Sequence, residues 1–323
     1  MVKILIIFLG LIIYSSSYSS SLTAWIKLCQ DGEHEFKYSC EQMRMASGGK
    51  PSTDESKWIK TYRRLKKIKY LDLTNKKITN LEPLSPFKNI KILSLRGNGI
   101  SDLTHLRSLR NLTHLDLKEN NIEAMEDLSE LKSLIALNLE DNQISDFSQL
   151  ASLKSLRTLN LNNNRITSEN LEGIAEFKSL TRLSLAQNRI DDISSLSDLN
   201  QLSELVLEDN QIEDLAALKS MKRLKVLFLN YNRIEDVSDL RDLLALEDLR
   251  LISNKIKDIS ALSGLKNLRK LHLFKNSRPC LAPLSQFNKL REVWLDVSQI
   301  CDLNPLSCLP DLQRVYLDEV RFI

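Results

Sequence analysis

Apolar residues recur along this chain with a period of 22 residues from Ile68 onward. Positions 1, 4, 6, 11, 14, 17 and 20 of each unit are apolar, and once two additional residues in the unit that begins at Leu156 are allowed for, Arg278 is the one exception in the eleven complete units. Such a period predicts a solenoid of stacked coils in place of the two globular domains that the chain length suggests. The twelve units, the last one incomplete at Ile323, begin at Ile68, Ile90, Leu112, Leu134, Leu156, Leu180, Leu202, Leu224, Leu246, Leu268, Leu290 and Leu312.

The spacing inside each unit predicts two elements. Positions 4 and 6 alternate with polar residues, as in Leu115-Asp116-Leu117, which is typical of a half-buried strand. Positions 14, 17 and 20 are three residues apart, which is the spacing of a short helical turn. A single coil cannot bury its own apolar residues, so neighbouring coils must stack to form one continuous core.

Two polar positions repeat as regularly as the apolar ones. Position 9 is asparagine in nine consecutive units, and an amide there can donate to and accept from the backbone of its own coil and the next. Position 13 is mostly aspartate, which we interpret as a helix N-cap and not as a catalytic carboxylate. The asparagines are Asn98, Asn120, Asn142, Asn164, Asn188, Asn210, Asn232, Asn254 and Asn276, and the aspartates are Asp102, Asp146, Asp192, Asp214, Asp236, Asp258 and Asp302.

The resulting motif is L-x-x-L-x-L-x-x-N-x-I-x-D-L-x-x-L. It resembles the 22-residue leucine-rich repeats of bacterial internalins and of the cytosolic phosphatase-regulator family, over about four-fifths of the chain. The resemblance implies an α/β fold, a curved right-handed horseshoe solenoid with a parallel concave sheet and short helical or 3-10 convex segments, used for protein binding. The chain differs from internalins in having no cell-wall sorting motif, and from the phosphatase regulators in having an export signal.

The residues before the repeats predict a signal peptide and a cap. Lys3 supplies a positive charge, Ile4 to Tyr14 is an apolar run about half as long as a membrane span, and small residues follow up to Ala24. We therefore expect a signal peptide over residues 1–24, an N-terminal cap over 25–67 and the leucine-rich-repeat domain over 68–323. The residues expected to lie on one helix face and cover the first coil are Trp58, Tyr62 and Leu65.

Export changes the interpretation of the five cysteines, because disulfides persist outside the cytoplasm. Cys29 and Cys40 are expected to close a short loop in the cap. Cys280 and Cys301 fall at neighbouring positions of successive coils, about 5 Å apart, and are expected to form a second disulfide. Cys308 is left over, as an unpaired surface thiol or as an intermolecular bridge.

Charge and histidine content exclude several classes of function. The 45 basic and 42 acidic residues alternate in sign along the chain, which does not favour a nucleic-acid partner. The four histidines are scattered, and we find no nucleophile elbow and no metal-ligand spacing. We therefore expect no enzyme activity, no cofactor, no metal and no small-molecule substrate. His272 is the one histidine on the aromatic face, and we interpret it as a ligand-contacting or inert imidazole and not as a general base.

The side chains expected on the concave face change character along the chain. Position 5 is polar in units one to six, at Asp72, Ser94, Asp116, Asn138, Asn160 and Ser184. From unit seven the same position is Val206, Phe228, Arg250, His272, Trp294 and Tyr316, and the neighbouring positions add Val226, Tyr231, Ile252, Lys270 and Phe274. Aromatic residues beside arginine and lysine are typical of binding hot spots, but cross-strand packing that stabilises the sheet explains them as well.

These features favour an exported protein that binds a protein or a glycan partner on its concave face in adhesion or recognition. Such a protein is expected to be secreted, periplasmic or at the cell surface, with membrane contact only through an uncleaved signal. The alternative is an intracellular scaffold similar to the phosphatase regulators, which requires an uncleaved N-terminus. An acidic group, interpreted as an ordinary solvated surface or as a steering patch for a basic partner, comprises Glu140, Asp141, Glu204, Glu208 and Asp209.

Overall fold

The computed structural model describes residues 18–50, 54–277, 281–296 and 304–318. The predicted signal segment before Tyr18 and the predicted disulfide between Cys280 and Cys301 lie outside the described residues, as do Arg278 and Asp302. The chain forms two compact units, Met1–Leu134 and Ile135–Ile323, which are described separately.

The first unit begins with three helices, α2 (Tyr18–Asp31), α3 (His34–Ala46) and α4 (Glu55–Leu65). The backbone N–H of Ser56 donates to the Asp54 side chain at the start of α4, at 2.9 Å. Trp58, Tyr62 and Leu65 are buried on one face of α4, as the sequence predicts.

The indole ring of Trp25 in α2 packs against α4 and the first coil. Its ring centroid lies 6.0 Å from Trp58, 5.2 Å from Tyr62 and 5.5 Å from Phe87 of the first coil. Its Nε1 donates to the carbonyl of Pro83 at 3.0 Å. The predicted disulfide between Cys29 and Cys40 is confirmed, with 5.6 Å between the Cα atoms, and it joins α2 to α3.

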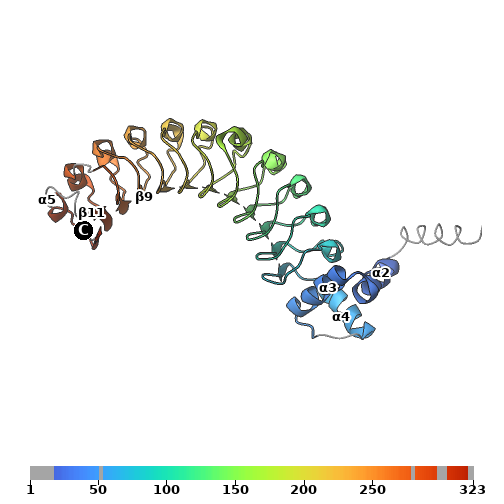
Figure 1. Ribbon diagram of the computed structural model, residues 1–323. Coiled ribbons are helices and arrows are strands. Elements are labelled where there is room, and N and C mark those ends of the chain that lie inside the picture. The colour runs from blue at the N-terminus through green and yellow to red at the C-terminus, as the bar shows by residue number, and fades with distance from the viewer. Residues whose placement is uncertain (1–17, 51–53, 278–280, 297–303, 319–323) are drawn as a thin grey trace, which may run out of the picture. The chain divides into compact units, whose positions relative to one another are not determined.

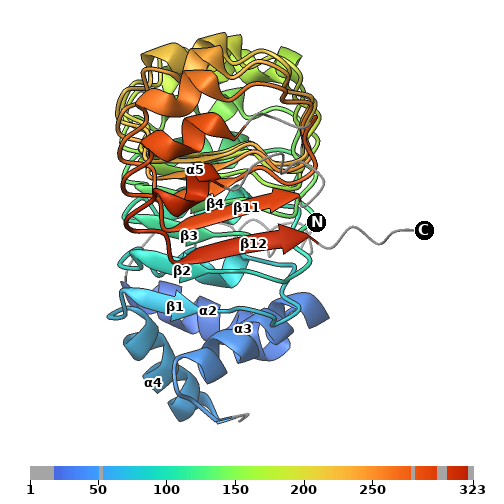
Figure 2. The same ribbon diagram turned by 90° about the vertical axis from the view of Figure 1, so that its left-hand side faces the viewer.

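Three coils follow the cap in the first unit. Their strands pair in parallel with a register of 22 residues, so that Leu71 lies beside Leu93 and Leu93 beside Leu115. Figure 2 shows α4 leading into the start of the first strand. The strands are β1 (Tyr70–Asp72), β2 (Ile92–Ser94) and β3 (His114–Asp116), and the 3-10 helices are η2 (Glu82–Leu84), η3 (Thr104–Ser108) and η4 (Glu126–Glu130).

The second unit contains nine parallel strands in chain order, so each coil adds one strand beside the last. Within this unit the strands lie on the concave side and the 3-10 helices on the convex side (Figure 1). The strands are β4 (Ala136–Asn138), β5 (Thr158–Asn160), β6 (Arg182–Ser184), β7 (Glu204–Val206), β8 (Val226–Phe228), β9 (Asp248–Arg250), β10 (Lys270–His272), β11 (Glu292–Asp296) and β12 (Arg314–Asp318). The helices are η5 (Ser148–Ser152), η6 (Ser168–Glu176), η7 (Ser194–Leu196), η8 (Ala216–Ser220), η9 (Ser238–Leu240), η10 (Ser260–Gly264), η11 (Ala282–Gln286) and α5 (Asn304–Ser307).

The repeated apolar positions form the core of both units. Leucines at positions 4 and 6 of the inner coils, such as Leu227 and Leu229, are buried, as are the isoleucines at position 11, such as Ile234, whereas Val315 and Leu317 at positions 4 and 6 of the last coil are exposed. The unit that begins at Leu156 has two additional residues, and they extend η6 to nine residues. The insertion is therefore absorbed on the helical side, and the strand register is kept.

The asparagine ladder is confirmed, with one difference in its direction. The Asn232 side chain donates to the carbonyls of Leu229 in its own coil and Leu207 in the preceding coil, at 3.1 and 2.9 Å. Its Oδ1 accepts from the N–H of Ile212, also in the preceding coil, at 3.0 Å. Eight of the asparagines bind the preceding coil in this way, where we had expected the following one: Asn98, Asn120, Asn164, Asn188, Asn210, Asn232, Asn254 and Asn276.

The aspartates at position 13 also accept hydrogen bonds from the backbone, but they lie one residue before the N-cap position. Asp236 accepts from the N–H of Ser238 at 2.8 Å, and Asp258 accepts from Ser260 at 2.8 Å. The N-cap residue itself is the following apolar residue, for example Val237. The N-cap interpretation was wrong by one position, because the aspartate forms an Asx turn that leads into the 3-10 helix.

Candidate recognition surface

The position-5 residues of the last six strands form one column across the second unit. The parallel register places Val206 beside Phe228, then Arg250, His272, Trp294 and Tyr316 on successive strands. The fold therefore brings together residues that are 22 apart in the sequence. We call these six residues the aromatic column.

The side chains of the aromatic column stack on one another. The Arg250 guanidinium lies 3.8 Å from the ring centroid of Phe228, which is a cation–π contact. The ring centroids of His272 and Trp294 are 4.8 Å apart, and those of Trp294 and Tyr316 are 4.5 Å apart. Phe274, two residues after His272, meets the edge of Trp294 at 5.5 Å.

Stacking changes which of the predicted residues are accessible. Val206 and His272 are only 9% and 6% exposed, so the expectation that they point freely to solvent was wrong. The ring of Trp294 stacks on that of His272. Tyr231, Lys270 and Tyr316 are exposed, and the half-buried members of the predicted set are Val226, Phe228, Arg250, Ile252, Phe274 and Trp294.

Carboxylates hold the polar groups of the column in place. Asp248 accepts from both Nε and Nη2 of Arg250, each at 3.2 Å. Glu292 accepts from the Trp294 indole at 2.9 Å and lies 3.2 Å from Nε2 of His272. These interactions fix the planes of the rings.

Burial and charge set the ionisation of this cluster. Burial, helped by the nearby Arg250 charge, lowers the pKa of His272, so the imidazole is neutral at physiological pH. Burial acts to raise the pKa of Glu292, but the hydrogen bonds from Trp294 and His272 outweigh it and lower that pKa. Because its ring stacks on Trp294 and is only 6% exposed, His272 acts as a packing group of the column.

Glu208 differs from the other acids of this face. Burial raises its pKa although the Asn230 side chain donates to Oε1, and the charge of Asp248 acts in the same direction as burial. The Asn230 amide oxygen accepts in turn from the N–H of Ile252, at 2.8 Å. Sequence reasoning placed Glu208 among solvated acids, and its partial burial depends on neighbours that the sequence alone did not identify.

Tyr231 is the most exposed aromatic residue of the predicted set, at 54%. Its φ of 57° lies in the left-handed region, which is rare for a bulky residue and costs roughly 1–2 kcal/mol. The residues at the equivalent position 8 of other described coils are Asn75, Gly97, Glu119, Asp141, Asn163, Gln187, Asp209, Ser253 and Lys275, which are glycine or polar. A tyrosine here is therefore tolerated by the fold but not favoured by it.

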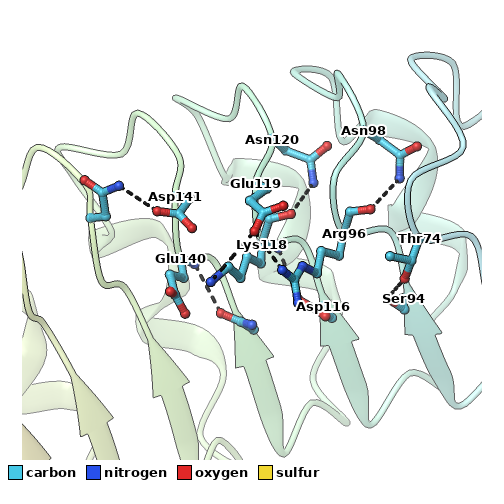
Figure 3. A network of polar contacts seen from close by, with 12 residues as sticks. Thr74, Ser94, Arg96, Asn98, Asp116, Lys118, Glu119, Asn120, Glu140 and Asp141 are labelled. Atoms are coloured by element: carbon cyan, nitrogen blue, oxygen red, sulfur yellow. Dashed lines mark hydrogen bonds and ion pairs between the residues drawn. The ribbon is translucent and has the colours of Figure 1, made fainter.

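The same face of the first unit is polar and is satisfied by its own contacts. Thr74 and Ser94 hydroxyls are 2.8 Å apart, and Arg96 donates to Glu119 at 2.8 Å (Figure 3). In the second unit, Glu140 accepts from Asn160 at 2.8 Å. Polar side chains are thus sufficient to build coils of this fold.

The described residues include no group of three or more histidine, cysteine or acidic side chains placed to hold a metal ion. Within the same residues, no helix has the length and apolar character needed to cross a membrane. Cys308 is a free, exposed thiol.

Comparison with known proteins agrees with this architecture. Family models described as leucine rich repeat match residues 110–166 and 154–212, and models of two leucine-rich-repeat copies match 201–242 and 222–263. A comparison with curated protein sequences found no significant match.

Several solved structures are similar over most of the chain. An internalin C2 from Listeria monocytogenes is 32% identical over 66% of this chain and 92% of its own, with a TM-score of 0.61. Another internalin from that organism, inlF, is 25% identical over 88% of this chain and 95% of its own, with a TM-score of 0.61. A leucine-rich-repeat protein of Leptospira interrogans is 26% identical over 80% of this chain and 74% of its own, with a TM-score of 0.68.

Stacked coils, an asparagine ladder and a parallel sheet with an aromatic column define a solenoid binding scaffold, a class of fold that is typically not enzymatic. The chain belongs to the leucine-rich-repeat family, and within that family it is similar to the internalins.

Proposed function

We propose that this protein is exported and binds a protein partner through the aromatic column and Tyr231, in recognition or adhesion. The observation that carries the proposal is the exposed aromatic side chain of Tyr231. Its backbone has a left-handed conformation, which glycine or asparagine adopts at lower energetic cost than tyrosine does. The positive φ recurs at this position in other coils, so the coil requires the conformation but does not require an exposed aromatic ring there.

The rest of the surface supports a protein partner. Tyrosine, tryptophan and arginine are the residues enriched in the energetic centres of protein interfaces. Trp294 and Tyr316 stack with their neighbours and so are ordered before binding, which lowers the entropy lost on association. The half-buried carboxylate of Glu208, with its raised pKa, adds a site where a lysine or arginine of the partner would be stabilised.

Export is supported by two features of the N-terminal part. The sequence before α2 has the charged, apolar and small-residue order of a secretory signal. The disulfide between Cys29 and Cys40 in the cap would be reduced in most cytoplasms. Both features count against the intracellular phosphatase-regulator alternative.

The aromatic column could serve only to stabilise the sheet, and Tyr231 separates the two explanations. Peptides are selected on the immobilised native protein from a displayed library, and their affinities for variants are then measured. Tyr231→Gly should weaken the selected peptides at least about tenfold, as expected for an interface anchor. The same variant should unfold at an equal or higher temperature, because glycine adopts this φ without strain.

Lys275→Gly is the matched control, because Lys275 is exposed at the same position of another coil with a φ of 56°. This variant should leave peptide affinity nearly unchanged. If Tyr231→Gly and Tyr316→Ser bind the selected peptides as well as the parent protein, the proposed surface is wrong. Binding to a glycan array in the absence of peptide binding would contradict a protein partner.

A further inference from the structure

The cap helix α4 has a second face that the core does not use. Its buried face carries Trp58, Tyr62 and Leu65, whereas Lys57, Lys60, Arg63 and Lys67 are exposed. Successive members of this exposed set are three, three and four residues apart, so three of them form one stripe along the helix and Lys67 continues it just after the helix ends.

The stripe continues onto the first coils of the same unit. The N–H groups of Lys91 and Ile92 donate to the carbonyl of Lys69 at 2.7 and 2.9 Å, which places the exposed side chains of Lys69 and Lys91 on adjacent strands. Figure 2 shows that α4 and the start of β1 meet at one end of the unit. We call Lys57, Lys60, Arg63, Lys67, Lys69 and Lys91 the basic surface.

The cations of the basic surface after Lys57 lack the ion pairs that other cations of the protein form. In the second unit, Lys154 pairs with Glu176 at 2.7 Å and Lys219 with Asp239 at 2.9 Å. Among the residues that the structure describes, no carboxylate forms an ion pair with Lys60, Arg63, Lys67, Lys69 or Lys91.

The sequence confirms the excess of positive charge. Residues 54–91 contain eleven basic and four acidic side chains, a formal net charge of +7, whereas the whole chain has +3. The remainder of the chain therefore carries −4. The balanced charge of the repeats does not extend to the cap and the first coil, and this asymmetry favours a polyanionic partner for this end.

Two exposed apolar side chains accompany the basic surface. Tyr70 follows Lys69 and is 59% exposed, and Ile92 follows Lys91 and is 41% exposed. The strand register places Tyr70 beside Ile92. Alternating lysine and apolar or aromatic groups are typical of the membrane–water interface, where the apolar part enters the headgroup layer and the ammonium group binds phosphate.

We propose that the basic surface binds the anionic phospholipid headgroups of a bilayer and holds the protein at the membrane peripherally. A bilayer fits better than a dissolved polyanion because the cations lie on the outer face of a helix, with apolar groups beside them, and not along a groove. The proposal extends the sequence-based expectation, which allowed membrane contact only through the apolar run Ile4 to Tyr14. It is independent of the partner that the aromatic column binds.

The test uses the full chain in the form that the producing cell yields. Two kinds of vesicle are compared, one of phosphatidylglycerol mixed with phosphatidylcholine and one of phosphatidylcholine alone. Cosedimentation should show binding to the anionic vesicles at low ionic strength. Combined replacement of Lys57, Lys60, Arg63 and Lys67 by glutamine should lower the partition coefficient more than about 100-fold, since each cation contributes about fivefold. Binding should also fall sharply in about 1 M salt, where the screening length is about 3 Å.

A matched variant separates the basic surface from net charge. In this variant, four lysines that form ion pairs are replaced by glutamine, which lowers the formal net charge of the chain from +3 to −1, as in the first variant. Vesicle binding should remain nearly unchanged. These lysines are Lys154, Lys219, Lys222 and Lys225, which pair with Glu176, Asp239, Asp242 and Glu247.

Several outcomes would overturn the proposal. Equal loss in the two quadruple variants would mean that binding follows total charge. Equal binding to neutral vesicles would mean that the N-terminal apolar run alone is responsible. Binding of heparin or self-association without vesicle binding would assign the basic surface to a soluble polyanion or to a second copy. Circular dichroism of both variants verifies that they remain folded, since glutamine is a good helix former.

Discussion

At the residue scale, the asparagine of position 9 replaces hydrogen bonds that the narrow bend after each strand cannot make by itself. Asn232 is 8% exposed and satisfies carbonyls of two coils together with one N–H group. A side chain without an amide would leave these backbone groups buried and unpaired. Its contribution is therefore larger than that of an ordinary surface hydrogen bond.

Asn232→Ala should lower the free energy of unfolding by about 2–4 kcal/mol, because several buried backbone groups lose their partner at once. Urea denaturation monitored by circular dichroism measures this change. Asn200→Ala is the control, because Asn200 is exposed and outside the ladder, and it should change stability by less than about 0.5 kcal/mol. Equal effects of the two substitutions would show that the ladder is not a major source of stability.

The sequence predicted these residues unevenly. The ladder could be predicted because its period and residue type are fixed by the backbone geometry of the coil. The burial of Val206 and His272 could not be predicted, because it depends on whether Phe228, Arg250 and Trp294 stack across the strands or point to solvent. The raised pKa of Glu208 escaped prediction for the same reason, since its neighbours come from other coils.

At the scale of elements, the cap closes the end of the sheet that β1 would otherwise leave open. Trp25, Trp58 and Tyr62 form an aromatic cluster on Phe87 of the first coil, and the Cys29–Cys40 disulfide joins the two helices before α4. An unprotected edge strand exposes unpaired backbone groups and invites aggregation. The cap therefore stabilises the first coil and protects it from pairing with other chains.

Trp58→Ala should cost about 3–5 kcal/mol, the usual range for removing a large aromatic residue from a core. The loss should be local, so amide hydrogens of β1 should exchange faster while those of β8 in the second unit keep their protection. Hydrogen exchange followed by mass spectrometry distinguishes the two strands. Lys57→Ala, next to Trp58 but on the outer face of α4, should leave both exchange rates unchanged.

Elements were predicted well where they repeat and poorly where they do not. Strand and helical positions of each coil follow from apolar spacings of two and three, and the spacing of three corresponds to 3-10 helices. In the cap, the sequence predicted only the helix that carries Trp58. The helices α2 and α3 escaped prediction because no repeat fixes the register of their buried residues, and a disulfide and one tryptophan organise them instead.

At the scale of the whole molecule, the two proposed surfaces belong to different units and have different chemistry. The basic surface lies in the first unit, where cations exceed acids, and the aromatic column lies in the second, where charges are paired. The recognition proposal includes export of the chain, whereas peripheral binding to anionic phospholipid does not require it.

Mass spectrometry of the natively produced, unreduced protein tests export. We expect an N-terminus near Trp25 and the loss of two hydrogens for each of two disulfides, Cys29–Cys40 and the predicted Cys280–Cys301. Cleavage after Ala24 would cut within α2, so the mature cap would begin at the tryptophan on which its packing depends. An intact Met1 with all thiols free would instead indicate a reducing compartment, where the intracellular scaffold becomes the better explanation and the basic surface would meet only cytoplasmic membranes. A cleaved chain with one disulfide would support export while correcting the second pairing.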